Sequence, residues 1–352
     1  MQTVTLRKAM IQAPELASPQ FKADPHPFYA RLRHEAPMYR TIVRLPEKRT
    51  AWLVTRYDDV VSVLRDGRLV KDLARATAPA ERVGATWVPG PLKPFTRNML
   101  DLDAPDHTRL RALVQKAFTP RLVEQLRPRI QSLADTFLER AFRNARVDLV
   151  SEYGLPIPIT VIADLLGIPD KDRRQFHRWS SRLVAVASPR DALTAIPAAW
   201  MFLRYLKRLI AWRRTESGDN LLGALLHVEE AGDRLSQDEL LGMLLLLLIA
   251  GHETTVNLIA SGTLALLQHA DQLERLRSEP SLIQPAIEEF LRFVSPVEIA
   301  TERYATHDLE LFGENVRRRD LVLAVLGSAN RDDRRFPQPD DLDITRTSNP
   351  HV

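Results

Sequence analysis

Hydrophobic residues recur every three or four positions through most of the chain, which is the spacing of helices with one buried face. Two short helices are predicted near the start, over residues 28–35 and 57–65. After Asp106 the pattern strengthens, and further helices are predicted over residues 107–118, 122–144, 158–166, 170–187, 192–216, 220–231, 237–269 and 286–294. The chain is therefore expected to be mainly helical.

Strand signals are few, so the fold class predicted is mainly α with a small β component. Residues 52–55 combine aromatic and β-branched side chains, and similar short runs return at 302–304, 309–311 and 321–324. Residues 79–95 are rich in proline and indicate a loop. Because the sequence has no internal repeat and no linker-like segment, we expect a single domain over residues 1–352.

The final stretch, residues 330–352, carries turn-forming residues and alternating charges with no helical pattern. A terminal coil with little apolar surface has little to dock it. We therefore expect this coil to be unsupported and the domain to be incomplete at its C-terminus.

The helix predicted over residues 237–269 begins with a capping box. Ser236 can cap the first turn, and Glu239 can reach back to the cap. An uninterrupted apolar run at 244–250 then predicts that the helix is buried on all sides.

A polar break follows at the centre of this helix. Gly251 costs about 1 kcal/mol relative to alanine in a helix interior, and a buried Glu253 is costly unless it is paired or hydrogen-bonded. The hydroxyls of Thr254 and Thr255 can bond the carbonyls one turn back and loosen the helix. Two interpretations stay open: a helix that bulges against a cofactor and relays protons, or a buried carboxylate that pairs with an arginine and only supports the fold.

Two further pairs of charged residues lie one helical turn apart. Asp106 can cap the helix over 107–118, and His107 and Arg111 then share one face, where both can hold one anionic group. Glu289 and Arg292 form an E-x-x-R pair on the helix over 286–294. Each pattern is also common on solvated helix faces, so neither identifies a site by itself.

Composition excludes several kinds of site. The chain has 49 basic and 45 acidic residues, a net charge of +4 and no cysteine, which excludes disulfides, zinc–thiolate sites, iron–sulfur ligation and a cysteine nucleophile within it. The start of an H-E-x-x-H zinc motif at His252 fails because position 256 is valine. The mild positive charge does not indicate nucleic-acid binding, but it suits an acidic protein partner.

Nothing in the pattern predicts export or membrane insertion. Residues 1–14 have no apolar core long enough for a signal peptide. The most apolar stretch, 240–251, is too short to span a bilayer. We expect a soluble, cytoplasmic protein.

In this order and spacing, the motifs resemble the cytochrome P450 family in its soluble bacterial form. They are the H-x-x-x-R helix, the A-G-x-E-T-T centre at 250–255, the E-x-x-R helix, the Pro296-Val297 segment leading to Arg303, and the A-N-R-D stretch at 329–332. The resemblance implies a P450 fold, a haem b cofactor and a monooxygenase. Such an enzyme would insert one oxygen atom of O2 into a small organic substrate with electrons from a ferredoxin and its reductase.

The resemblance also implies roles for single residues. His107, Arg111 and Arg303 would hold the haem propionates. Thr254 would hold the oxygen species and Glu253 would feed the proton path. The remaining assignments are Ala250 and Gly251 in the oxygen-binding bulge, Glu289 and Arg292 as a structural lock with Asn330 and Arg331, and residues 79–95 with the helices between 170 and 212 as the cover of the substrate cavity.

One departure matters. In the family, a haem loop with the ligating cysteine and one more helix would follow, and this sequence ends at Val352 before them. Without a thiolate the iron loses the ligand that favours cleavage of the oxygen–oxygen bond. The chain as given is therefore expected to be inactive, and the alternative is a P450-like binding or partner protein without catalysis. The sequence gives neither the substrate nor the position at which it is oxidised.

Overall fold

The computed structural model describes residue 16 and residues 18–45, 47–77, 98–144, 146–184, 189–216, 220–230 and 232–352. Internal contacts divide the chain into two compact units, Met1–Val83 with Ser261–Val352, and Gly84–Ala260. Below, unit 1 and unit 2 mean the described residues of these two ranges, and each is considered by itself. The predicted loop at 79–95 lies outside the described residues, and the single domain stays a prediction.

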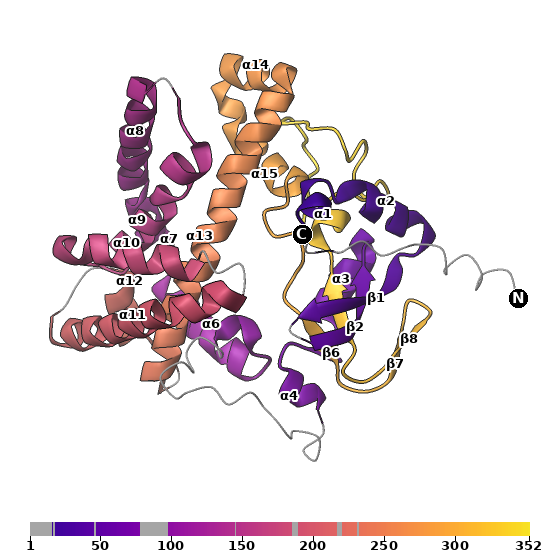
Figure 1. Cartoon of the computed structure of the whole chain (residues 1–352), viewed down its shortest axis with the longest axis horizontal. Helices are drawn as coiled ribbons and strands as arrows, with labels where there is room; N and C mark the ends of the chain where they lie inside the picture. The colour runs from indigo at the N-terminus through magenta and orange to yellow at the C-terminus, as the bar shows by residue number, and fades with distance from the viewer. Residues whose placement is uncertain are drawn as a thin grey trace, which may run out of the picture. The chain divides into compact units, whose positions relative to one another are not determined.

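Unit 1 is built on a five-stranded sheet in the order β1-β2-β9-β6-β3. Its strands are β1 (Met38–Leu45), β2 (Glu47–Val54), β3 (Leu69–Val70), β6 (Arg303–Ala305) and β9 (Leu321–Ala324). β2 pairs with β9 in parallel, Ala51 opposite Leu321, and β1 pairs with β2 antiparallel, Met38 opposite Val54. The sheet therefore joins the first and last parts of the described chain (Figure 1).

The helices of unit 1 are short. They are α1 (Pro19–Ala23), α2 (His26–Glu35), α3 (Tyr57–Arg65), α4 (Leu73–Ala76), α14 (Ala270–Ser278), α15 (Ile283–Phe293) and α16 (Leu326–Ala329). A 3-10 turn, η6 (Pro280–Leu282), precedes α15, and the strands β7 (Leu309–Leu311) and β8 (Glu314–Val316) form a separate hairpin. The sequence did not predict α14, which buries none of its side chains and so carries no clear core face.

Unit 2 is almost entirely helical. Its helices are α6 (Asp106–Ala117), α7 (Pro120–Gln125), α8 (Arg127–Asn144), α9 (Pro156–Leu165), α10 (Asp170–Val184), α11 (Pro189–Thr215), α12 (Leu221–His227) and the larger part of α13 (Gln237–Gln268). Short elements connect them: η4 (Met99–Asp101), the π-turn η5 (Leu149–Gly154), and the hairpin of β4 (Glu229–Glu230) and β5 (Asp233–Arg234).

Two predicted helices needed correction. The helix expected over 122–144 is two helices, α7 and α8, which meet at Leu126. The helix expected over 220–231 ends at His227, and the β4–β5 hairpin begins at Glu229. In both places apolar residues continue at helical spacing across the break, so periodicity alone could not locate it.

The core of unit 2 surrounds the first half of α13. Leu240, Leu241, Leu244, Leu245 and Leu248 are each at most 2% exposed and belong to one apolar cluster with residues of α9, α10 and α11. Among the described helices, α13 is also long and apolar enough to cross a membrane by length and composition. A core helix passes the same test, and the burial of these leucines within unit 2 identifies α13 as one.

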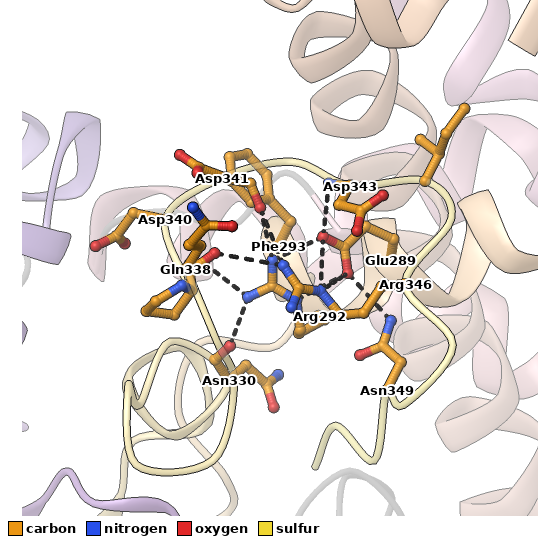
Figure 2. A network of polar contacts seen from close by, with 12 residues as sticks. Glu289, Arg292, Phe293, Asn330, Gln338, Asp340, Asp341, Asp343, Arg346 and Asn349 are labelled. Atoms are coloured by element: carbon orange, nitrogen blue, oxygen red, sulfur yellow. Dashed lines mark hydrogen bonds and ion pairs between the residues drawn. The ribbon is translucent and has the colours of Figure 1, made fainter. Parts of the chain in front are cut away.

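The terminal stretch, residues 330–352, has neither helix nor strand, as predicted, but it is not an unsupported coil. Phe336 and Ile344 are fully buried, Leu342 is 4% exposed, and the backbone folds around the Arg292 side chain (Figure 2). The prediction was wrong because three apolar side chains and a buried arginine are enough to dock a segment without regular hydrogen bonding.

Candidate functional site

The capping box at the start of α13 is confirmed. The Ser236 backbone N–H donates to Glu239 Oε2 at 2.8 Å, and the Glu239 N–H donates to Ser236 Oγ at 3.3 Å. Arg109 of α6 forms ion pairs with Glu239 and, at 2.9 Å, with Asp233. The start of α13 is thereby tied to α6, the helix that carries His107 and Arg111.

The expectation that α13 is buried on all sides is wrong. Ile249 is 45% exposed, and Gly251 and Glu253 are also exposed, so Glu253 is not a buried carboxylate. It makes no hydrogen bond or ion pair with any residue that the structure describes. Since each residue turns the helix by about 100°, positions 249 and 253 lie on the same face of α13. The apolar run before them does not show whether other elements cover that face.

The buried polar side chain at this point is instead His252, which is 4% exposed. Neither of its ring nitrogens has a hydrogen-bond partner among the described residues, and burial lowers the pKa of the imidazole. A neutral imidazole therefore faces the core while Glu253 faces outward.

Both threonine hydroxyls bond back along the helix, as predicted. Thr254 Oγ1 donates to the carbonyl of Ala250 at 2.8 Å, and Thr255 Oγ1 donates to the carbonyl of Gly251 at 2.9 Å. The helix nevertheless continues as regular α-helix through residues 250–255, so the expected bulge is not seen. A Cβ added at Gly251 would meet only Ile162 within 4 Å, at 3.5 Å, which leaves the backbone here open to a close approach.

His107 and Arg111 lie one turn apart on α6, His107 partly buried and Arg111 exposed. Arg111 makes no hydrogen bond or ion pair within the described part of the chain. The expectation that Asp106 caps this helix is wrong: the cap is Pro105, and Asp106 is the first helical residue.

Arg303 is the first residue of β6 and is 9% exposed. Its Nη1 donates to Thr301 Oγ1 at 2.6 Å and to the carbonyls of Thr301 and Glu302. Arg303 lies in unit 1, whereas His107 and Arg111 lie in unit 2. The convergence of the three side chains on one anionic group stays a prediction.

Glu289 and Arg292 on α15 are both fully buried and form a bidentate pair, at 2.8 Å from Nε to Oε2 and at 2.7 Å from Nη2 to Oε1. Figure 2 shows that the other guanidinium N–H bonds reach backbone carbonyls of the terminal stretch. These acceptors are Asn330 at 2.9 Å, Pro339 at 2.7 Å and Asp341 at 3.1 Å. Removing one partner of such a pair strongly destabilises the folded protein, because the other charge would remain buried without compensation.

Sequence reasoning missed three further partners of Glu289. Arg346 Nε donates to Glu289 Oε2 at 3.2 Å, Asn349 Nδ2 donates to the same atom at 3.1 Å, and the Asp343 N–H donates to Oε1 at 3.0 Å. No local signal distinguishes Arg346 from other arginines in a coil, because its partner lies 57 positions earlier in the chain. Arg331, which the sequence did single out, is held by Asp340 at 3.0 Å and lies 4.0 Å from the ring centre of Phe293.

Comparison with known proteins gives the class of this fold. Residues 201–351 match the family model described as Cytochrome P450. The chain is 46% identical to cytochrome P450 107B1 of Saccharopolyspora erythraea over 94% of its own length and 81% of that protein. It is also 46% identical to the vitamin D(3) 25-hydroxylase of Pseudonocardia autotrophica, over 94% of this chain and 80% of that protein. The solved structure of PksS, a polyketide synthase cytochrome P450 of Bacillus subtilis, superposes with a TM-score of 0.87 at 38% identity, covering 97% of this chain and 84% of that one.

The chain belongs to the cytochrome P450 family, and its named relatives are P450 monooxygenases. The family implies haem, and two features of the structure fit that group. The exposed side chain of Ile249 and the open backbone at Gly251 form an apolar surface that a flat macrocycle can cover. Arg111 offers a positive charge that has no partner among the described residues. The thiolate that the resemblance implies is not among these 352 residues, since they include no cysteine.

Proposed function

We propose that this chain carries the oxygen- and substrate-side residues of a haem b monooxygenase that hydroxylates a small organic molecule. The observation that supports the proposal most is the centre of α13. There an open glycine, an exposed acid and two hydroxyl groups follow soon after the largely buried leucines at 244–248. A helix that served only packing would have no use for this sequence of residues at the edge of its core.

His107, Arg111 and Arg303 would hold the propionates of the haem. Two carboxylates placed beside an apolar macrocycle need cationic, hydrogen-bonding partners that offset their desolvation. Arg111 is the strongest candidate, because it has no other partner in the described chain. His107 lies one turn before it on the same face of α6.

Thr254 and Glu253 divide the proton-handling roles. The Thr254 hydroxyl donates its hydrogen to Ala250, so its oxygen remains free to accept a hydrogen bond from water or from a protonated group. Glu253 is exposed and can exchange protons with solvent. The haem would supply the oxidation itself. Thr254 would position the water that donates the proton, and Glu253 would return a proton to that water from solvent.

The substrate class, the electron donor and the location in the cell are inferred from the family and the net charge, not from contacts within the structure. The vitamin D(3) 25-hydroxylase acts, by its name, on vitamin D(3), and we infer a small apolar or macrocyclic substrate here. A net charge of +4 suits an acidic ferredoxin-type donor with its reductase. We infer a cytoplasmic protein that binds neither membrane nor nucleic acid.

The absence of cysteine supports a second candidate function. A chain of these 352 residues has no thiolate for the iron and is proposed to be inactive by itself. Such a chain could act as a P450-like binding or partner protein. The acid and hydroxyls at 253–255 favour the enzyme, because a binding protein has no need of them.

The two candidates are separated by joining Val352 to the cysteine-bearing haem segment of cytochrome P450 107B1. Thr254→Ala in this fusion should leave haem binding intact and increase the peroxide released per product. Glu253→Gln should mainly slow turnover, since acid–base positions contribute about 10²–10⁴-fold. Product, cofactor consumed and peroxide are measured together. Unchanged coupling and rate in both variants would contradict the roles given to the α13 centre.

A further inference from the structure

A cavity of about 560 Å³ opens between α10 and α11 of unit 2. The two helices lie side by side (Figure 1). Asp172, Gln175 and Trp179 line it from α10, and Tyr205, Arg208 and Trp212 line it from α11. Within each helix these residues are spaced three, four or seven apart, so each set forms one stripe that faces the other helix.

The walls of this cavity are aromatic. Trp179 and Tyr205 pack with ring centres 5.7 Å apart, and Trp179 is only 7% exposed. Its Nε1–H is buried and has no hydrogen-bond partner among the described residues. Trp212 is 37% exposed, which leaves its ring available to a flat ligand.

The wall formed by Trp212 is held in position. The guanidinium of Arg213 lies 4.3 Å from the centre of the Trp212 ring, and its Nη2 donates to the carbonyl of Gly167 at 2.8 Å. A ring fixed in this way loses less side-chain entropy when a ligand stacks on it.

The charges at the rim favour an anion. Lys171 and Arg208 line the cavity, are exposed, and form no ion pair or hydrogen bond with described residues. Asp172 is the opposing charge, and it accepts a hydrogen bond from the Tyr205 hydroxyl at 3.2 Å. Burial first, and then Asp172, raise the pKa of Tyr205, so the phenol stays neutral and two cations face one acid.

We propose that this cavity is a binding site for an aromatic carboxylate. The ligand stacks on the exposed ring of Trp212, beside the edge of Trp179, while its carboxylate lies toward Lys171 and Arg208. The volume lies within the range of sites that take drug-sized ligands. The site uses no residue of the α13 centre or of α6, although its two helices belong to the segment that the resemblance assigns to the cover of the substrate cavity.

The test uses the full 352-residue chain and naphthalene-2-carboxylate, with naphthalene-2-carboxamide as the neutral comparison. Indole N–H signals of the five tryptophans are followed by NMR during titration. We expect the signals of Trp179 and Trp212, assigned with Trp→Phe variants, to shift. The acid should bind about 5-fold more tightly than the amide, the size expected of two exposed cations.

Charge variants decide whether the site is the one proposed. Lys171→Gln with Arg208→Gln should remove the preference for the acid without weakening the amide, and Asp172→Asn should strengthen acid binding. Arg214→Gln, an exposed arginine of α11 that does not line the cavity, is the matched control and should change nothing. Equal affinity for acid and amide, an equal effect of Arg214→Gln, or unmoved Trp179 and Trp212 signals would overturn the proposal.

Discussion

At the scale of single residues, the surroundings of His26 at the start of α2 disfavour protonation of its imidazole. Its Nδ1 is buried and has no partner among the described residues. Burial, and next the positive charge of Arg331, lower the pKa of His26 from 6.5 to about 4, with a smaller contribution from Arg33. The nearby acids Asp24 and Asp340 act in the opposite direction but do not outweigh them.

This shift predicts that acid destabilises the protein through His26. Between pH 6.5 and about 4 the unfolded chain binds a proton that the folded chain does not, so stability falls as the pH falls through this window. The loss is on the order of 2–3 kcal/mol, reduced by the partial exposure of the side chain. Urea unfolding at pH 7 and pH 4.5 should give a smaller difference for His26→Gln than for the unchanged chain.

The exposed His227 of α12 provides the control, and His227→Gln should leave the acid destabilisation as it is. An undiminished pH dependence in His26→Gln would mean that other groups carry it.

At the scale of elements, α13 contains two glycines in different surroundings. Gly251 is exposed, and an added Cβ would lie 3.5 Å from Ile162, an ordinary contact. Gly262 is buried, and its Cβ would lie 3.3 Å from the ring of Phe290 on α15. Gly251 therefore lowers the helix propensity without improving the packing. Gly262 lies in the end of α13 that belongs to unit 1, and it allows this end to approach α15 closely.

Gly251→Ala should accordingly stabilise the folded chain by about 1 kcal/mol, the propensity difference in a helix interior. Gly262→Ala should gain less or lose stability, because the Phe290 ring must move. Denaturant unfolding of both variants measures the difference. If Gly251 allows haem to approach the backbone, the more stable Gly251→Ala chain should also take up haem more weakly. An equal gain from both substitutions would show that packing at Gly262 is not tight.

At the scale of the whole molecule, the residue types of the chain limit which side chains can ligate a haem iron. The 352 residues offer no sulfur other than that of six methionines. Reconstituted with haem and reduced under carbon monoxide, the chain should not give the Soret band typical of thiolate-ligated iron. The fusion that supplies a cysteine should give it. A thiolate-type band from the unfused chain would contradict this prediction.

Local spacing allowed much of the fold to be predicted. The helix expected over 237–269 is α13 (Gln237–Gln268), and the strands expected at 309–311 and 321–324 are β7 and β9. Each is a property of consecutive residues, since the capping box and the period of the side chains are carried by the segment itself. The order of the motifs was likewise enough for the P450 family, which the comparisons confirm.

What depended on partners far along the chain could not be predicted in this way. β1 was missed because its charged, alternating sequence becomes a strand only by pairing with β2. The exposure of Glu253, the burial of His252 and the role of Arg346 each depend on which elements pack against that face. The sequence by itself determined most of the helices, the family and the residue types available for chemistry. Only the tertiary structure decided which of those side chains face the core, which face solvent, and that residues 330–352 fold around Arg292, because burial is set by contacts between distant segments.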